Sequence, residues 1–426
     1  MKITNPKQIK AQLEGRDTWF PYYAGYSSKF AETIVKSADL PGDAVVLDPW
    51  NGGGTTTAVT NKLGLRAHGV DLNPAMVIAA KARLLSSREA TSLVPLAEEI
   101  VAKARQLGEP LGGSDPLTIW FQPSSALVLR RLERSIEILL SDRHDCLDFS
   151  RQATVNDLSG LAAFYYFALF RTVRDLAQEF VPSNPTWTTQ PAAENRVRPN
   201  EIRIHAAFRG MVQSMSHAIA TEPAGTTTNA EVVLHVASSE ALPTASNSVD
   251  LVLTSPPYCT RIDYAVATML ELAVLRFHPN GTLDALRRSL IGTSTVVKVV
   301  PDVRADWGVA CLRFLKGVQG HYSKASKTYY YKNHLQYFES MFSSMQEVNR
   351  VLKAGARGVL VVQDSYYKEV HNPLPNILAQ MSQSIGLRLE NMRGYEAKAV
   401  MANMNPKTKL YRTSRSASEC VMVLRK

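Results

Sequence analysis

The stretch VVLDPWNGGGTTT, residues 45–57, decides the fold. The apolar run 44–48 predicts a buried strand that ends at Asp48. Three consecutive glycines, 52–54, then allow a tight turn and a close approach of the backbone to a ligand. Thr55 and Thr56 begin the next helix, so their N–H groups and hydroxyls face the same crevice. A strand, a glycine turn and a helix in this order are typical of an open α/β sheet.

A second strand and helix follow the first pair. Residues 66–72 predict a strand that ends near Asp71, and Pro74 stands at the first turn of a helix over 74–85. An acid at this position commonly hydrogen-bonds a ribose diol. The glycine loop has neither the GK[ST] of a P-loop nor the GxGxxG spacing, so an adenosine ligand other than a nicotinamide cofactor is favoured.

The rest of the chain supplies further strands for the same sheet. Helical patterns at 264–277 and 334–352 lie between some of them. No helix separates the last two, so we expect these to pair antiparallel. The sequence therefore predicts an α/β fold with a seven-stranded, mostly parallel, Rossmann-like sheet, whose remaining strands are 231–236, 249–254, 358–364, 387–395 and 419–424.

Two insertions interrupt this alternation. Residues 86–229 contain amphipathic helices at 127–140 and 158–180, and they separate the second strand from the third. A second insertion, 279–333, ends in the basic and aromatic stretch KTYYYK at 327–332. The predicted organisation is 1–85 with the glycine loop, the helical insertion 86–229, and 230–426 with the inserted segment 279–333.

The strand 249–254 runs into TSPPY, residues 254–258. Ser255 offers a hydroxyl acceptor, and Pro256 offers a carbonyl held by the ring of Pro257. Tyr258 offers an aromatic face on which an extruded base can stack. An amino group of a base is a poor nucleophile, so acceptors that hold its hydrogens promote attack on a methyl group by positioning. The alternative is a proline-terminated strand with an incidental tyrosine.

These motifs together resemble those of the DNA amino-methyltransferases. DPWNGGGTT followed by GVDLNP is similar to the S-adenosylmethionine loop of that family, and TSPPY is similar to its catalytic (S/D/N)PPY motif. The segment 19–35 resembles the aromatic segment that covers the cofactor, and 335–365 and 418–426 resemble the late motifs. The resemblance covers 19–85, 231–277 and 334–426 and implies a class I methyltransferase fold.

The resemblance also implies roles for individual residues. Asp48 faces the methionine end of S-adenosylmethionine, Gly52 and Gly54 allow close approach, and Asp71 binds the ribose. Ser238 stands near the adenine-contacting position, which is often Asp. The expected catalytic residues are Ser255, Pro256, Pro257 and Tyr258, and the expected cofactor-binding residues are Tyr26, Asp48, Pro49, Asn51, Gly52, Gly54, Thr55, Thr56, Asp71, Leu72 and Ser238.

The first residue of the catalytic motif favours one base. A serine, as in TSPPY, resembles the N4-cytosine enzymes, whereas aspartate or asparagine is usual in the N6-adenine enzymes. The expected activity is transfer of a methyl group to N4 of a flipped cytosine in DNA. N6-adenine methylation, methylation of a guanine amino group in RNA and a catalytically silent nucleic-acid-binding subunit are the alternatives. The sequence leaves open whether the protein serves restriction-modification, another defence system or a separate role.

The charge balance favours a nucleic-acid partner. The formal net charge is +10, from 48 Lys and Arg against 38 Asp and Glu. We expect the insertion 86–229 to recognise the target; a helical cap or a dimer interface is the alternative, and a homodimer stays open. The stretch 327–332 is either a strand-binding surface or a packed helix start. The predicted DNA contacts are Lys407, Lys409, Arg412, Arg196 and Arg198.

Cysteines and apolar runs restrict the remaining possibilities. The four cysteines are far apart and no histidine lies at ligand spacing from them, so no metal site is expected. Cys259 is expected to pack against the pocket instead of acting as a nucleophile. No apolar run is long enough for a membrane span and no signal core begins the chain, so a reducing cytoplasmic location is expected.

Overall fold

A computed structural model gives the fold of most of the chain. The residues that it describes are 1–7, 15–19, 25–108, 115–141, 147–182, 188–222, 228, 230–260, 262–397 and 417–426.

The centre of the molecule is a seven-stranded sheet with the strand order β3-β2-β1-β4-β5-β9-β8. The first five strands in this order are parallel, and β9 runs antiparallel to both of its neighbours. This confirms the predicted seven-stranded Rossmann-like sheet and the antiparallel pairing of the last two strands. The strands are β1 Val45–Asp48, β2 Arg66–Asp71, β3 Val232–Val236, β4 Val249–Thr254, β5 Leu352–Gln363, β8 Arg388–Ala397 and β9 Ala417–Arg425.

Helices cover both faces of this sheet. Alternate residues of a strand point to opposite faces, so Val46 and Leu253 pack with helices α1 and α2, while Leu47 and Val252 pack with α13 and α14. Both faces are apolar, as expected for parallel strands that are buried on two sides. The helices are α1 Ser28–Ser37, α2 Thr55–Lys62, α3 Pro74–Arg83, α13 Tyr331–Val351 and α14 Leu374–Ser384.

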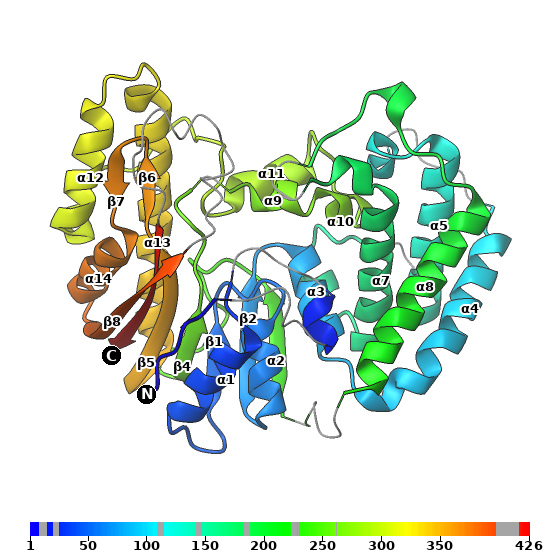
Figure 1. The fold of residues 1–426 in the computed structure, drawn as a ribbon, viewed down its shortest axis with the longest axis horizontal. Helices are drawn as coiled ribbons and strands as arrows, with labels where there is room; N and C mark the ends of the chain where they lie inside the picture. Colours follow the sequence, from blue (N-terminus) through cyan, green and yellow to red (C-terminus); the bar gives the residue numbers. More distant parts are fainter. Residues whose placement is uncertain are drawn as a thin grey trace.

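The first insertion forms a separate helical layer beside β2 and the edge strand β3 (Figure 1). Helix α7 is buried on all sides over Phe164–Phe170, and it packs against α3, α5, α8 and α10. The predicted helix 158–180 ends earlier, at Leu176. The helices of the insertion are α4 Ala90–Gln106, α5 Pro123–Leu140, α6 Gln152–Asn156, α7 Gly160–Leu176 and α8 Glu201–Ala220.

A buried ion pair and hydrogen bonds from a buried arginine fasten this insertion to the segment that follows TSPPY. Arg174 of α7 contacts both carboxylate oxygens of Glu271, at 2.6 and 2.7 Å. Arg130 of α5 donates to the carbonyl oxygens of Ala273 and Val274 at 3.1 and 2.7 Å. The predicted helix 264–277 is divided at Thr268 into α9 Tyr264–Ala267 and α10 Met269–Val274, and the second part carries these contacts.

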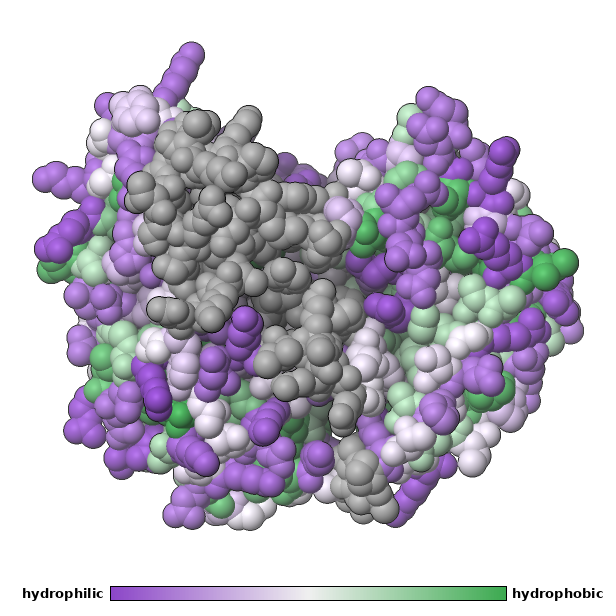
Figure 2. All heavy atoms as spheres, in the orientation of Figure 1, coloured by the Kyte–Doolittle hydropathy of each residue, from purple (hydrophilic) through white to green (hydrophobic). Residues whose placement is uncertain are grey.

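The second insertion connects the two sides of the molecule. Helix α11, Thr282–Ser289, lies between the helical insertion and the sheet, whereas α12, Val309–Gly320, lies on the far side next to α13 (Figure 1). A short hairpin, β6 Ser365–Tyr367 with β7 Val370–Asn372, follows β5 and was not predicted. On the face in Figure 2, the helical insertion is mostly hydrophilic with separate apolar residues.

Candidate functional site

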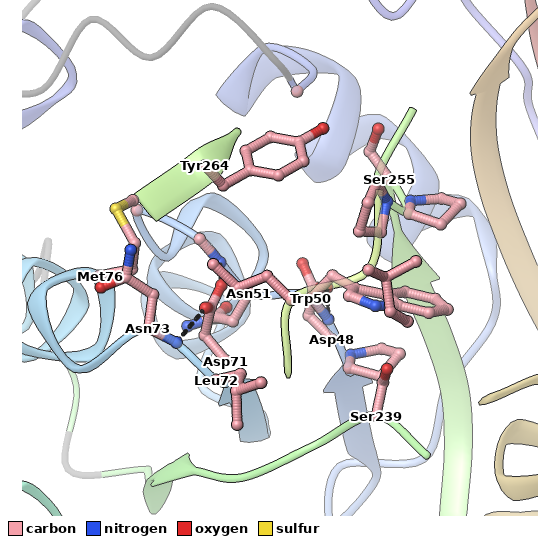
Figure 3. Close-up of a pocket in the computed structure, with 18 of the residues that line it drawn as sticks. Asp48, Trp50, Asn51, Asp71, Leu72, Asn73, Met76, Ser239, Ser255 and Tyr264 are labelled. Carbon is pink, nitrogen blue, oxygen red and sulfur yellow. Dashed lines mark hydrogen bonds between the residues drawn. The ribbon is translucent and has the colours of Figure 1, made fainter. Parts of the chain in front are cut away.

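A cavity opens at the carboxyl ends of β1, β2 and β4. Trp50 and Asn51, which precede the three glycines, lie between Asp71 and Leu72 on one side and Ser255 on the other (Figure 3). This is the edge where open α/β sheets bind ligands. The structure brings most of the predicted site residues to its walls: Tyr26, Asp48, Pro49, Asn51, Gly52, Thr55, Asp71, Leu72, Ser238, Ser255, Pro256 and Pro257.

Asp48 is the buried centre of the hydrogen bonds around the loop. One carboxylate oxygen accepts from the Thr254 hydroxyl at 2.6 Å and from the Trp50 N–H at 3.1 Å. The other accepts from the Thr56 hydroxyl at 2.6 Å and from the Tyr26 hydroxyl at 3.3 Å. Burial raises the pKa of Asp48, although these hydrogen bonds act in the opposite direction. Asp48 therefore joins β1 to α2, β4 and the segment before α1.

Two of the predicted cofactor-binding residues lie outside the lining of the cavity. Thr56 is fully buried, and its hydroxyl supports Asp48. Gly54 has a positive φ of 82°, and a Cβ atom there would lie 2.8 Å from the Cβ of Ala80 on α3. The predicted close approach at Gly54 is therefore to helix α3, whereas Gly52 faces the cavity.

Asp71 holds the glycine loop through main-chain donors. Its carboxylate accepts from the N–H of Gly52 at 2.9 Å and from the N–H of Asn73 at 2.8 Å. Burial raises the pKa of Asp71 to about 6, and these two hydrogen bonds oppose the shift. Each oxygen accepts one of these bonds, so each keeps a lone pair for a ligand hydroxyl.

The TSPPY segment presents acceptors to the same cavity. The Ser255 hydroxyl donates to the carbonyl oxygen of Val361 on β5 at 3.0 Å. The Pro257 carbonyl accepts from the Tyr337 hydroxyl at 2.7 Å, whereas the Pro256 carbonyl receives no hydrogen bond within the described part of the chain. A side-chain hydrogen bond also joins Ser255 to Tyr258. Because a hydroxyl oxygen has two lone pairs, Ser255 keeps one for a ligand, and the Pro256 carbonyl keeps its acceptor capacity within the described part of the chain.

Tyr258 is half-buried and is not among the residues that line the cavity. Its main-chain N–H donates to the hydroxyl of Tyr264, which does line the cavity, at 3.1 Å. Burial raises the pKa of Tyr258 well above its usual range, and the nearby Glu419 carboxyl adds to this effect. Burial also raises the pKa of Glu419 to about 7.

The structure adds lining residues that the sequence did not reveal. Asn73 and Met76 come from the start of α3, and Leu290 and Ile291 come from the second insertion. Asp17 and Arg83 also line the cavity and form an ion pair with each other. No pattern in the sequence relates position 17 to position 83, so only the fold could reveal this pair.

The structure describes two of the five residues that were predicted to contact DNA. Lys407, Lys409 and Arg412 lie outside the described residues. Arg198 is exposed and Arg196 is half-buried, both on the irregular segment before α8. The stretch 327–332 forms a π-helical turn that leads into α13, with the Tyr330 ring 4.7 Å from the Tyr367 ring. This packing favours the helix-start interpretation over a strand-binding surface.

Cysteines, metal-ligating groups and apolar helices give three further observations. Cys259 was expected to pack against the pocket, but it is buried in the core and does not line the cavity; its sulfur lies 3.4 Å from Nδ1 of His334. In the described ranges, no three His, Cys, Asp or Glu side chains are grouped so that they could hold a metal ion. No helix in those ranges combines the length and the apolar character that crossing a membrane requires.

Comparisons with known proteins show a likeness to methyltransferase structures. No family model matches the chain, and no curated protein matches it. A geranyl diphosphate methyltransferase solved with GPP and sinefungin is 8% identical over 94% of this chain and 79% of that one, with a TM-score of 0.33. A methyltransferase from Methanosarcina mazei, described as SAM-dependent, is 10% identical over 92% and 96%, with a TM-score of 0.31. An rRNA methyltransferase from Streptomyces viridochromogenes is 11% identical over 95% and 87%, with a TM-score of 0.28.

Proposed function

We propose that this protein is a DNA amino-methyltransferase that transfers a methyl group from S-adenosylmethionine to N4 of a flipped cytosine. The observation that carries the proposal is one cavity that contains both the glycine loop with Asp71 and the acceptor oxygens of Ser255 and Pro256. The motif TSPPY and the glycine loop are 200 residues apart in sequence but line the same space.

The residues on the Asp71 side fit the nucleoside part of S-adenosylmethionine. The free lone pairs of the Asp71 carboxylate suit the two hydroxyls of a ribose. Beyond Asp71, Leu72 and Ile291 offer apolar surface for an adenine ring, and Ser238 offers a polar group at its edge. When bound, S-adenosylmethionine supplies an electrophilic methyl group on a sulfonium sulfur.

The residues on the TSPPY side fit an amino group that carries two hydrogens. The Ser255 hydroxyl gives its proton to Val361, so its oxygen is left to accept a hydrogen. The Pro256 carbonyl supplies a second acceptor, and the ring of Pro257 fixes its direction. Accepting both hydrogens orients the amino nitrogen and increases the electron density of its lone pair, which promotes in-line attack.

Tyr258 and the helical insertion complete the proposed recognition of DNA. The Tyr258 ring provides an aromatic surface beside the acceptors for a base that has left the helix. The insertion 86–229 recognises the target, and its ion pair between Arg174 and Glu271 holds it in a fixed position relative to the TSPPY segment. Arg196, Arg198, Lys407, Lys409 and Arg412 contact phosphates, consistent with the net charge of +10.

Incubation with S-adenosylmethionine labelled on its methyl group tests this proposal. The purified protein is offered mixed-sequence DNA and, separately, mixed-sequence RNA, and the nucleosides are analysed by mass spectrometry. We expect label in N4-methylcytosine from DNA. Label in N6-methyladenine would show that the target base is adenine and not cytosine, with the same mechanism of transfer to an amino group. Label in RNA alone, or tight binding of the cofactor with no transfer to either polymer, would contradict the proposal.

A further inference from the structure

We propose that Arg83 and Asp17 bind the amino-acid end of S-adenosylmethionine, with Arg83 on its carboxylate and Asp17 on its ammonium group. This inference rests on the proposed function and assigns a binding role to two residues outside the motifs of the sequence. Both residues line the cavity, next to Gly53 and Thr55 of the glycine loop.

Arg83 is the last residue of α3, and its guanidinium lies under the glycine loop. Its Nη1 donates to the carbonyl oxygen of Gly53 at 2.7 Å and lies 3.5 Å from the hydroxyl oxygen of Thr55. Its Nη2 pairs with the carboxylate of Asp17. The side chain is 9% exposed, and its buried Nε has no partner among the described residues. A guanidinium has five donors in a planar fork, so donors remain for a carboxylate.

Asp17 lies opposite, on a short 3-10 helix at Gly15–Thr18. The hydroxyl of Ser28, the first residue of α1, donates to its carboxylate at 2.7 Å. The Asp17 side chain is 26% exposed, so it is more accessible than Arg83. An ammonium group therefore has a partly open carboxylate to approach.

The order of groups along the ligand places its amino-acid end here. With the ribose on Asp71 and the adenine toward Leu72, the sulfur faces Ser255 and Pro256 so that the methyl group points at the acceptor. The methionine chain then extends past the glycine loop, away from the adenine. Among the described lining residues, Arg83 carries the one positive charge, while Asp48 already accepts four hydrogen bonds.

A second arginine fixes the position of Arg83. The Nη1 of Arg16 donates to the carbonyl oxygens of Arg83 and Leu85 at 2.5 and 2.6 Å. The Nε of Arg16 pairs with Glu222, just after α8 of the insertion, at 3.0 Å. The end of α3 is therefore held in place before any ligand arrives, which lowers the entropy cost of binding.

Calorimetry with two ligands tests the assignment. S-adenosylhomocysteine carries the amino-acid group, whereas 5′-methylthioadenosine has the same adenosine thioether without it. We expect Arg83→Gln and Asp17→Asn each to weaken binding of S-adenosylhomocysteine by about 30-fold. Binding of 5′-methylthioadenosine should change less than about threefold. Arg88→Gln, at an exposed arginine five positions after Arg83, is the matched control and should leave both affinities unchanged.

The ratio of the two affinities within each variant separates binding from folding. An equal loss for both ligands would show that the pair only supports the fold and would overturn the inference. If Arg83→Gln does not fold, Asp17→Asn, which keeps the shape of the side chain, gives the same comparison. If the unaltered protein binds neither ligand, the proposed function itself fails. If it binds both ligands equally, only the role of Arg83 and Asp17 fails.

Discussion

The two sides of the cavity use their polar groups in opposite ways. On the glycine-loop side, Asp48 accepts four hydrogen bonds from the protein and Asp71 accepts two from the main chain. On the TSPPY side, Ser255 gives away its only proton and the Pro256 carbonyl has no partner in the described chain. The first side is completed by its own hydrogen bonds, whereas the second keeps acceptor capacity.

This difference separates binding from chemistry. A loop that is already held by Asp48 and Asp71 loses little conformational entropy when a ligand arrives. Acceptors without a hydrogen-bond partner raise the free energy of the free protein. That free energy is recovered when an amino group donates its hydrogens to them. Substitutions on the first side should therefore change stability and affinity, while those on the second should change the rate.

The largest expected effect is on stability, in Asp48→Ala. This variant leaves the buried hydroxyl of Thr254 without its acceptor. The hydroxyls of Thr56 and Tyr26 also lose an acceptor and are left to share the carbonyl oxygen of Leu253. We expect the free energy of unfolding to fall by about 4 kcal/mol, because several buried donors lose their partner together. Chemical denaturation followed by circular dichroism measures this change.

Asp43→Ala is the control for that loss. Asp43 lies just before β1 and its side chain is exposed, so its removal should change the free energy of unfolding by less than about 0.5 kcal/mol. Equal stability of the Asp48 and Asp43 variants would show that the hydrogen bonds around Asp48 do not hold the loop.

The second effect is on the rate, in Ser255→Ala. Loss of one acceptor for the amino group should lower kcat about 100-fold, the size usual for one polar group that stabilises a transition state. The affinity for S-adenosylhomocysteine should stay within about twofold, because Ser255 is on the side away from Asp71. Single-turnover methyl transfer and calorimetry measure the two quantities.

Ser246→Ala is the matched control for this variant. Ser246 is exposed and precedes β4, at the opposite end of the strand from TSPPY. It should leave kcat and affinity unchanged. Full activity of Ser255→Ala would remove the acceptor role of the hydroxyl and with it the distinction between the two sides.

The sequence predicted the parts of this comparison that depend on local pattern. Apolar runs and glycine turns place all seven strands, and the ends of β1, β2 and β4 place Asp48, Asp71 and Ser255 at one edge. Contacts between distant segments could not be predicted in this way. Gly54 looks like a ligand contact in the sequence, yet its conformation is required by the packing of α2 on α3.

The same limit explains the break at Thr268 and the missed pair of Asp17 and Arg83. The apolar pattern of 264–277 continues through Thr268, but its hydroxyl accepts a hydrogen bond from Asn73 at 2.8 Å. Arg83 lies in a helix that was predicted, but the periodicity of a helix does not say which loop its last side chain reaches. Both features depend on the docking of α3.

The smallest expected effect is a pH dependence of cofactor affinity. Burial raises the pKa of Asp71 to about 6, so the carboxyl becomes protonated as the pH falls through that value. A protonated carboxyl loses acceptor capacity for the ribose hydroxyls. The affinity for S-adenosylhomocysteine should therefore fall about tenfold between pH 8 and pH 5, where about one tenth of the carboxyl is ionised.

The stability of the free protein should respond to Asp71 with the opposite sign. The pKa of Asp71 in the folded state is above its ordinary value of 3.8, so its contribution to stability is complete below 3.8 and is lost as the pH rises through 6.

Asp71→Asn should remove the pH dependence of affinity and leave a constant, weaker binding. A variant that keeps the tenfold change would place the titrating group elsewhere, and Asp48 is then the next carboxyl to substitute, because its pKa is also raised by burial. Affinity and stability should therefore change in opposite directions with pH, and both changes should be absent in Asp71→Asn. This result would identify Asp71 as the group whose negative charge destabilises the free protein and strengthens ligand binding.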